Sequence, residues 1–261
     1  MEPDAARQYA TTRKLGARGS LHDRYAPTSW FAWVAERLPL SAGDRVLDIG
    51  CGPAWFWRSA LVNLPNDLHL TLTDAAPVMV EAARFERVPA GVGSLVVEQA
   101  EASALPYPEE SFDVAIAMHM LYHVADPSAV CAQMLRVVRP GGHVAVTTNT
   151  RSNFRRLGEI GAAAFGGSSD DLGAASFSLD DAEALLAGSF MDIERHDLVD
   201  EYRITDRRDV AAFLLSMPPG DEADDAAIAR MNGIIADAMR EGDGAVVTTR
   251  ETGIVTARKR A

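Results

Sequence analysis

The sequence predicts an α/β protein with a doubly wound, mostly parallel sheet and helices on both faces. Short apolar runs alternate with stretches of helical periodicity over residues 45–148. Alternation at this spacing is typical of right-handed strand–helix–strand units in a parallel sheet. The chain has 261 residues, of which 48% are hydrophobic, so it is long enough to bury such a sheet as one large domain.

Each core element is expected from its local pattern. Pro53 and Pro77 stand where first helical turns should begin, and Asp126-Pro127 opens a third helix. The Pro-Gly-Gly run at 140–142 ends that helix before the fifth strand. The apolar runs predict strands at 45–49, 69–73, 94–98, 114–118 and 143–148.

The flanks are expected to be mainly helical, with two late strands that bring the sheet to seven. An aromatic amphipathic helix is predicted at 25–38, and a Gly/Ser/Asp loop at 166–173. The late strands are expected at 190–198 and 244–257, and helices at 153–164, 180–187 (ended by Gly188), 206–217 and 222–240. Residues 1–42, 43–150 and 151–261 would then be an N-terminal helical segment, the core, and the part that completes the sheet.

Charge and composition narrow the partners. With 25 basic and 37 acidic residues, the net charge of −12 disfavours nucleic acid as a partner. Cys51 and Cys131 offer neither a disulfide framework nor metal-ligand spacing. No apolar leader or membrane-spanning stretch is evident, so a cytoplasmic protein is expected, as a monomer or homodimer.

The loop after the first strand is the expected ligand site, because ligands of open parallel sheets bind at the carboxyl ends of strands. It contains Gly50 and Gly52. A dinucleotide fingerprint needs a third glycine three residues later, and that position is Trp55. No Gly-Lys-Ser/Thr follows either, which excludes a Walker loop and leaves nicotinamide binding only as an alternative.

The run Asp48-Ile49-Gly50-Cys51-Gly52 resembles the first motif of the class I S-adenosylmethionine-dependent methyltransferases. Further motifs follow in order, in "LTLTDAAPVMVEAAR", in "LPYPEESFDVAIAMHMLYHVADP" and in "LRVVRPGGHVAV". The resemblance covers roughly residues 43–150. It implies a Rossmann-like fold, with residues 1–42 as a lid and helices at about 206–240 as a cap.

The resemblance also implies a site for S-adenosylmethionine. Asp74 ends the second strand, where the family has an acid for the two ribose hydroxyls, and one carboxylate can accept from both. Glu101 stands where the family often has an Asp near the adenine amino group, and Ala54 where it often has glycine. The remaining implied positions are Tyr25, Asp48, Gly50, Gly52, Ala75, Met79, Ala102 and Met118.

The aromatic residues have two interpretations each. Residues 55–57 fall on the first turns of a helix, so most should be core and about one in three should reach the ligand. Tyr25, Trp30 and Trp33 could fasten the N-terminal helix to the core or, by the resemblance, cover the cofactor, with Tyr25 near its methionine end.

Three residues after the fourth strand are the candidates for proton transfer or for orienting a substrate: His119, Tyr122 and His123. His119 is favoured for substrate contact, and a structural hydrogen bond is favoured for His123. The spacing of His119, His123 and Asp126 superficially suggests a metal, but the family has a similar Leu-Tyr-His stretch without one, so no metal is expected.

The function that this implies is in-line methyl transfer from S-adenosylmethionine to a small molecule, with S-adenosylhomocysteine as the product. The layout looks like that of quinone-type C-methyltransferases and bacterial natural-product methyltransferases, with carbon, oxygen and nitrogen acceptors all open. The alternatives are a regulatory protein that binds the cofactor without catalysis and a nicotinamide-dependent oxidoreductase.

Overall fold

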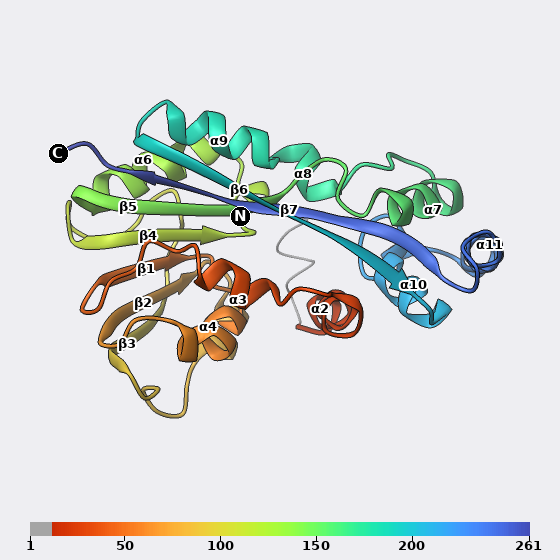
Figure 1. Ribbon diagram of the computed structural model, residues 1–261, viewed down its shortest axis with the longest axis horizontal. Coiled ribbons are helices and arrows are strands. Elements are labelled where there is room, and N and C mark those ends of the chain that lie inside the picture. The colour runs from red at the N-terminus through yellow and green to blue at the C-terminus, as the bar shows by residue number, and fades with distance from the viewer. Residues whose placement is uncertain (1–11) are drawn as a thin grey trace.

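The computed structural model describes residues 12–261 and is organised around a seven-stranded sheet with strand order β3-β2-β1-β4-β5-β7-β6 (Figure 1). β7 pairs antiparallel with β5 and β6, whereas β1 to β5 are parallel. The predicted doubly wound, mostly parallel sheet is confirmed. The strands are β1 (Arg45–Ile49), β2 (Leu68–Asp74), β3 (Val92–Gln99), β4 (Phe112–Met118), β5 (Val138–Asn149), β6 (Met191–Ile204) and β7 (Val246–Arg258).

Helices cover both faces of the sheet because side chains alternate along each strand. Leu47 of β1 belongs to the core under α6 (Pro127–Val137) and α9 (Leu179–Ala187). Its neighbour Val46 belongs to the core under α3 (Trp30–Ala35) and α4 (Trp55–Ala60), and α5 (Pro77–Ala83) packs on β2 and β3. The two layers lie on opposite sides of the sheet in Figure 1.

Two helix starts agree with the sequence and a third is shifted. α5 begins at Pro77 and α6 at Pro127, where the Asp126 carboxylate accepts from the N–H groups of Ser128 and Ala129. α4 begins at Trp55, two residues after Pro53, because Ala54 adopts a left-handed backbone with φ of +57°.

The single N-terminal helix predicted at 25–38 is wrong. The structure has two helices, α2 (Thr12–Tyr25) and α3, separated at Pro27. Proline lacks an N–H group and disfavours the helical conformation of the residue before it. Ser29 then starts α3 by accepting from the N–H of Ala32. Residues 1–11 of the expected N-terminal segment lie outside the described residues.

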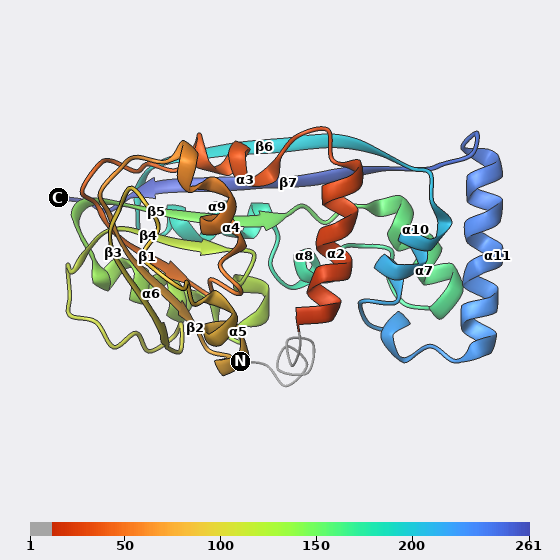
Figure 2. The ribbon, with the colours of Figure 1, turned by 90° about the horizontal axis from the view of Figure 1, so that it is seen from below.

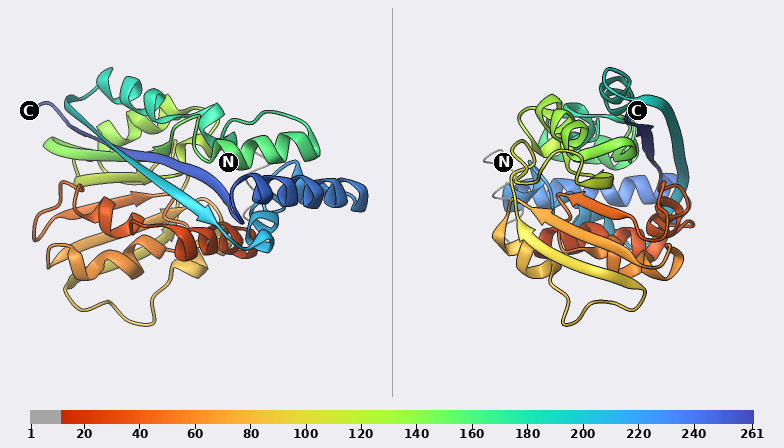
Figure 3. Two further views of the ribbon diagram at one scale, coloured as in Figure 1. Left: turned by 45° about the vertical axis from the view of Figure 1, so that its right-hand side comes forward. Right: turned by 90° about the vertical axis from the view of Figure 1, so that its left-hand side faces the viewer.

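β6 and β7 extend past the other strands and carry a group of helices (Figure 2). β6 was expected to end at residue 198 but continues to Ile204, with alternate side chains buried against this group. α8 (Leu172–Ser176) overlaps the loop expected at 166–173. The helices on the extension are α7 (Arg155–Phe165), α10 (Arg207–Leu214) and α11 (Asp225–Glu241). Elsewhere in the described chain, short 3-10 helices are η1 (Leu61–Asn63) and η2 (Leu121–His123), and η3 (Gly220–Glu222) lies between α10 and α11. Figure 3 shows the extension projecting from one end of the sheet.

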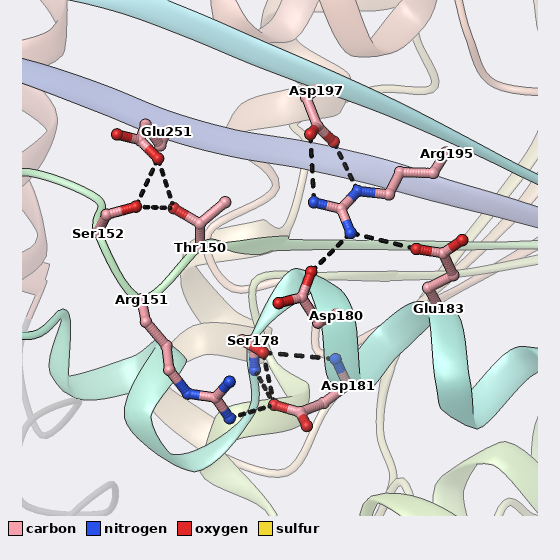
Figure 4. A network of polar contacts seen from close by, with 10 residues as sticks. All are labelled: Thr150, Arg151, Ser152, Ser178, Asp180, Asp181, Glu183, Arg195, Asp197 and Glu251. Atoms are coloured by element: carbon pink, nitrogen blue, oxygen red, sulfur yellow. Dashed lines mark hydrogen bonds and ion pairs between the residues drawn. The ribbon is translucent and has the colours of Figure 1, made fainter.

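Arg195 ties β6 to α9. Its guanidinium donates to Asp197 on its own strand at 2.8 Å, and to Asp180 and Glu183 of α9 at 2.7 and 3.1 Å (Figure 4). Arg195 is half-buried and its three partners are exposed, so each of these bonds is partly screened by water. The network holds α9 beside the outermost strand.

Candidate active site

The loop after β1 is held in left-handed backbone conformations. Gly50 has φ of +71° and Gly52 has φ of +54°, a region that favours glycine. A Cβ atom at Gly50 would lie 2.8 Å from the Cβ of Met120, whereas a Cβ at Gly52 would meet no atom within 4 Å. Gly50 is therefore required by packing, and Gly52 faces open space. The left-handed Ala54 stands where the resemblance expects glycine.

Asp74 joins the β1 loop to the end of β2. Its Oδ2 accepts from the Gly52 N–H at 3.0 Å, and its Oδ1 accepts from the Ala76 N–H at 2.9 Å. Each carboxylate oxygen has two lone pairs, so both keep capacity for a further donor. Burial raises the pKa of Asp74, the two N–H bonds oppose this, and the negative charge of Glu101 adds to the rise. Asp74 and Glu101 thus lie within electrostatic reach of each other.

Asp48 is 1% exposed and only half satisfied. Its Oδ2 accepts from the indole Nε1 of Trp57 at 2.7 Å, while its buried Oδ1 has no hydrogen-bond partner among residues 12–261. Burial raises the pKa of Asp48 to about 7, against the lowering effect of the Trp57 bond and with help from the charge of Asp74. A buried carboxylate oxygen without a partner is costly, which marks a place for a donor from a ligand.

The other predicted cofactor positions surround this cluster. Ala75 follows Asp74 and its carbonyl accepts from Gln99 at 2.8 Å. Met79 on α5 and Ala102 are buried in the protein interior, and Met118 lies half-buried at the end of β4. Their contact with a cofactor stays a prediction.

Tyr25 bonds to α10, whereas the resemblance placed it near the methionine end of the cofactor. Its hydroxyl donates to Asp209 of α10 at 2.8 Å and accepts from the Asp206 N–H at 3.3 Å. Contact between this hydroxyl and a cofactor would require both bonds to break, so that predicted role gains no support from the geometry.

A cavity of about 1560 Å³ adjoins the β1 loop. Its walls come from α2, α3, the end of β4, the segment after β5, α7 and α10. Gly50, Gly52 and Asp74 do not line it, whereas Trp55, at the start of α4, does. The cavity therefore reaches the loop region at Trp55, and Gly50, Gly52 and Asp74 lie outside its lining.

His119, Tyr122 and His123 all line this cavity. The centroid of the His119 ring lies 5.3 Å from that of Trp30 and 6.4 Å from that of Tyr122, and the Tyr122 and His123 rings are 4.3 Å apart. The structure thus brings the three catalytic candidates together, where β4 ends and η2 begins.

The histidines of the cavity are neutral at physiological pH. Burial lowers the pKa of His119 to about 3, and this pKa is lowered further by the charge of Arg250 and by the repulsion that protonated His22 and His123 would exert on a protonated His119. Burial and Arg18 lower the pKa of His123 to about 4. A neutral imidazole can accept a hydrogen bond, but general bases work best with a pKa near the operating pH. His119 is therefore better suited to form a hydrogen bond with a substrate than to remove a proton from it.

Several cavity residues were missed in the sequence because their partners are distant along the chain. Arg250 of β7 is 3% exposed and donates to Asp200 and to the Thr28 carbonyl, the latter at 3.0 Å. The hydroxyl of Tyr202 lies 2.8 Å from Nδ1 of His22 on α2. The available signal was that Arg250 shares the strand face of buried Ile254, where a charged residue is rarely buried without a partner.

Two asparagines line the cavity where β5 ends. The side-chain amides of Asn149 and Asn153 donate to Oδ2 of Asp171 at 3.1 and 2.8 Å. The intervening loop is held by Glu251 of β7, which accepts from the hydroxyl of Ser152 (Figure 4). These bonds fix the positions of both amides at the cavity wall.

The aromatic residues divide between the core and the cavity wall, and contact of any of them with a ligand stays a prediction. Phe56 and Trp57 are buried in the core, and Trp55 reaches the cavity. Trp30 and Trp33 stack with centroids 5.4 Å apart, and of these two Trp30 lines the cavity while Trp33 belongs to the core. The N-terminal helices therefore both pack on the core and wall the cavity.

No cluster of three or more His, Cys, Asp or Glu side chains that could hold a metal ion is found within residues 12–261. Over the same residues, no helix is both long enough and apolar enough to cross a membrane.

Residues 47–146 match the family model described as "Methyltransferase domain". This part of the chain is similar to methyltransferase domains. It contains β1, β2, β3 and β4, the loop with Gly50 and Gly52, and the cluster of His119, Tyr122 and His123. The resemblance to class I methyltransferases that the motifs carried is thereby confirmed.

Known proteins similar to the chain match it over less than half of its length. The 27-O-demethylrifamycin SV methyltransferase of Amycolatopsis mediterranei is 44% identical over 117 residues, which are 43% of this chain and 41% of that protein. A ubiquinone biosynthesis O-methyltransferase of Xylella fastidiosa is 34% identical over 120 residues, 46% of this chain and 47% of that protein. The matched region spans less than half of either relative.

The fold extends further than the sequence similarity. The structure of phosphoethanolamine N-methyltransferase 2 from Haemonchus contortus, in complex with S-adenosyl-L-methionine, matches 96% of this chain and 58% of that one. Its TM-score is 0.56 at 18% identity, so the similarity is one of fold.

Proposed function

We propose that this protein transfers a methyl group from S-adenosylmethionine to a small molecule and releases S-adenosylhomocysteine. The observation that carries the proposal is the placement, within the methyltransferase domain, of the Asp48, Gly50, Gly52 and Asp74 cluster beside the large cavity. When bound, the cofactor supplies a methyl group activated by a positively charged sulfur.

The residues present fit such a cofactor. The free capacity of Asp74 suits the two ribose hydroxyls, and Glu101 suits the adenine amino group. The unpartnered Oδ1 of Asp48 suits the ammonium of the methionine part. The open space at Gly52 leaves the backbone accessible to the ligand.

The cavity supplies the acceptor site. His119 and Tyr122 would accept from or donate to the acceptor and orient its nucleophilic atom, while His123 packs against Tyr122. The printed names of the two relatives describe methylation of oxygen, and we propose an oxygen acceptor here too.

The N-terminal lid up to residue 42 and the cap at about 206–240 belong to this proposal. Bonds between α2 and α10 support it, because they connect the two segments directly. The cytoplasmic location, the monomer or homodimer and the absence of a nucleic-acid partner stay predictions.

Equilibrium dialysis with S-adenosylmethionine, S-adenosylhomocysteine and NAD tests cofactor choice, and we expect binding of the first two alone. Transfer of radiolabelled methyl from the cofactor into a metabolite extract then separates an enzyme from a regulatory binder. Binding of NAD instead would support the oxidoreductase, and cofactor binding without a labelled product would support the regulator.

Asp74→Ala should lower the affinity for both S-adenosylmethionine and S-adenosylhomocysteine by roughly tenfold to a hundredfold, because the ribose hydroxyls lose their hydrogen-bond acceptor. Asp74→Asn keeps one acceptor oxygen and should fall between Asp74→Ala and wild type. Calorimetric titration measures both ligands. The control is Asp224→Ala, which removes the cap of α11 outside the cavity. Selective loss of the sulfonium ligand would instead place Asp74 near the sulfur.

A further inference from the structure

The side chains that line the cavity include a polar group beside the sheet and an apolar group between α7 and α10, and the loop at 168–171 adds Ser168, Ser169, Asp170 and Asp171 to the wall. At the end next to the sheet lie His119, Tyr122, Asn149 and Arg250. The end between α7 and α10, which we call the α7–α10 end, is lined by Leu157, Phe165, Phe213, Leu214 and Met217. Leu157, Phe213 and Leu214 are buried in the hydrophobic core of the extension, so this end has a fixed apolar wall.

Of the two glycines on α7 that line the cavity, Gly161 leaves room at the α7–α10 end. A Cβ at Gly158 would clash with the carbonyl oxygen of Ser169, so Gly158 instead allows close backbone packing. A Cβ at Gly161 would lie 3.4 Å from Cδ2 of Leu214 and meet no other atom within 4 Å. Glycine inside a helix is less stable than alanine, and here its effect is to leave room that a side chain would fill.

The α7–α10 end also lies away from the methyltransferase motifs. It is built on the extension of β6 and β7, which projects beyond the ends of the parallel strands (Figure 2). The cavity, at about 1560 Å³, exceeds the range of roughly 300–1,000 Å³ typical of sites for drug-sized ligands. An acceptor confined to the polar end would leave apolar walls facing water, which is unfavourable.

We propose that the methyl acceptor is an elongated amphiphile. Its nucleophilic group lies at the polar end beside His119 and Tyr122, and its apolar body fills the α7–α10 end. This inference rests on the proposed function, and it adds the substrate class: a molecule with a polar head that accepts the methyl group and an apolar portion beyond it.

The experiment uses 4-methylcatechol, 4-butylcatechol and 4-octylcatechol as probes with one head and three tail lengths. Their binding to the full chain, with S-adenosylhomocysteine present, is measured by calorimetry. Each added methylene that enters the apolar end should tighten binding by about fourfold, until the end is full. Equal affinities for the three catechols, or no binding of 4-octylcatechol, would overturn the proposal.

Gly161→Leu places a side chain in the α7–α10 end and should weaken 4-octylcatechol by about tenfold or more, while leaving 4-methylcatechol unchanged. Gly233→Leu is the matched control, since Gly233 is a helical glycine on α11 that does not line the cavity. Ala162→Phe blocks the same end from the next position on α7 and must give the same result. An unchanged ratio of octyl to methyl affinity in both blocking variants would refute the apolar subsite.

S-adenosylhomocysteine is titrated into every variant in parallel. Normal binding of this product with tail-independent catechol affinity would refute the amphiphilic acceptor alone. Failure of the wild-type chain to bind the product would refute the proposed function, and tail-dependent catechol binding would still locate an apolar subsite.

Discussion

Asp48 is a single residue whose protonation should report on cofactor binding. Its pKa is raised to about 7, so the carboxyl is about half ionised near neutral pH. An ammonium group at Oδ1 favours the ionised form. S-adenosylhomocysteine should therefore release about half a proton at pH 7, measured by calorimetry in buffers of different ionisation enthalpy. Asp48→Asn should release none from this site, and the same buffer dependence in both proteins would place the ammonium elsewhere.

The two glycines of the β1 loop should differ in their effects on stability. Gly50→Ala adds a methyl group that clashes with Met120 at an unfavourable φ, so it should lower the free energy of unfolding by roughly 2–4 kcal/mol. Gly52→Ala causes no clash and is disfavoured only by the positive φ, so it should lower the free energy of unfolding by about 1 kcal/mol. Urea denaturation measures both changes. Equal losses in the two variants would contradict the packing difference.

At the scale of elements, α2 is fastened to α10 through Asp209. Arg24 and Tyr25 both bond to this carboxylate. Since Arg24 is mostly exposed, Asp209→Ala should cost at most about 1 kcal/mol of stability and yet free the end of α2. We expect faster trypsin cleavage after Arg24 with little change in the melting temperature. Asp237→Ala, which removes an exposed pair on α11, is the control. Unchanged cleavage would indicate static packing of α2.

The elements also differ in how well the sequence predicted them. Strands β1 to β5 were predicted because each is a short apolar run between helix signals, and periodicity alone specifies them. The break at Pro27 was missed because aromatic residues on both sides preserve a helical pattern across it. The length of β6 was missed since residues 199–204 alternate against helices whose position depends on tertiary packing.

The site shows the same division. Asp48, Gly50, Gly52 and Asp74 were found because their motif is local. Arg250 could not be predicted, because its bond to Thr28 spans 222 positions and no local pattern encodes that contact.

For the whole molecule, stability should fall in mild acid. The pKa values of His22, His119 and His123 are lowered to between about 3 and 4. Between pH 6.5 and 4 the unfolded chain therefore binds protons at these positions and the folded chain does not, so unfolding is favoured as pH falls. The lowered pKa of His143 acts in the same direction, whereas the raised pKa values of Asp48 and Asp74 oppose it, so four histidines act against two carboxyl groups.

The melting temperature should accordingly decrease from pH 7 to pH 5. Asp48→Asn removes one of the two opposing groups and should make the decrease steeper, whereas His22→Gln should make it shallower. Differential scanning calorimetry of the three proteins measures these slopes. A melting temperature that is constant or rises toward pH 5 would show that the histidines are not held neutral.

Because β7 lies between β5 and β6 in the sheet but follows both along the chain, the sheet stays incomplete until β7 is made. A chain that leaves the ribosome from its N-terminus exposes Gly50 and Asp74 long before β7 is synthesised. Until β7 inserts, β5 keeps an unpaired edge, the kind of edge that recruits other strands and invites aggregation. The cavity lacks Arg250 and Thr252 for the same interval. The β1 loop and the cavity thus form at different times, and the nascent chain is most vulnerable between them.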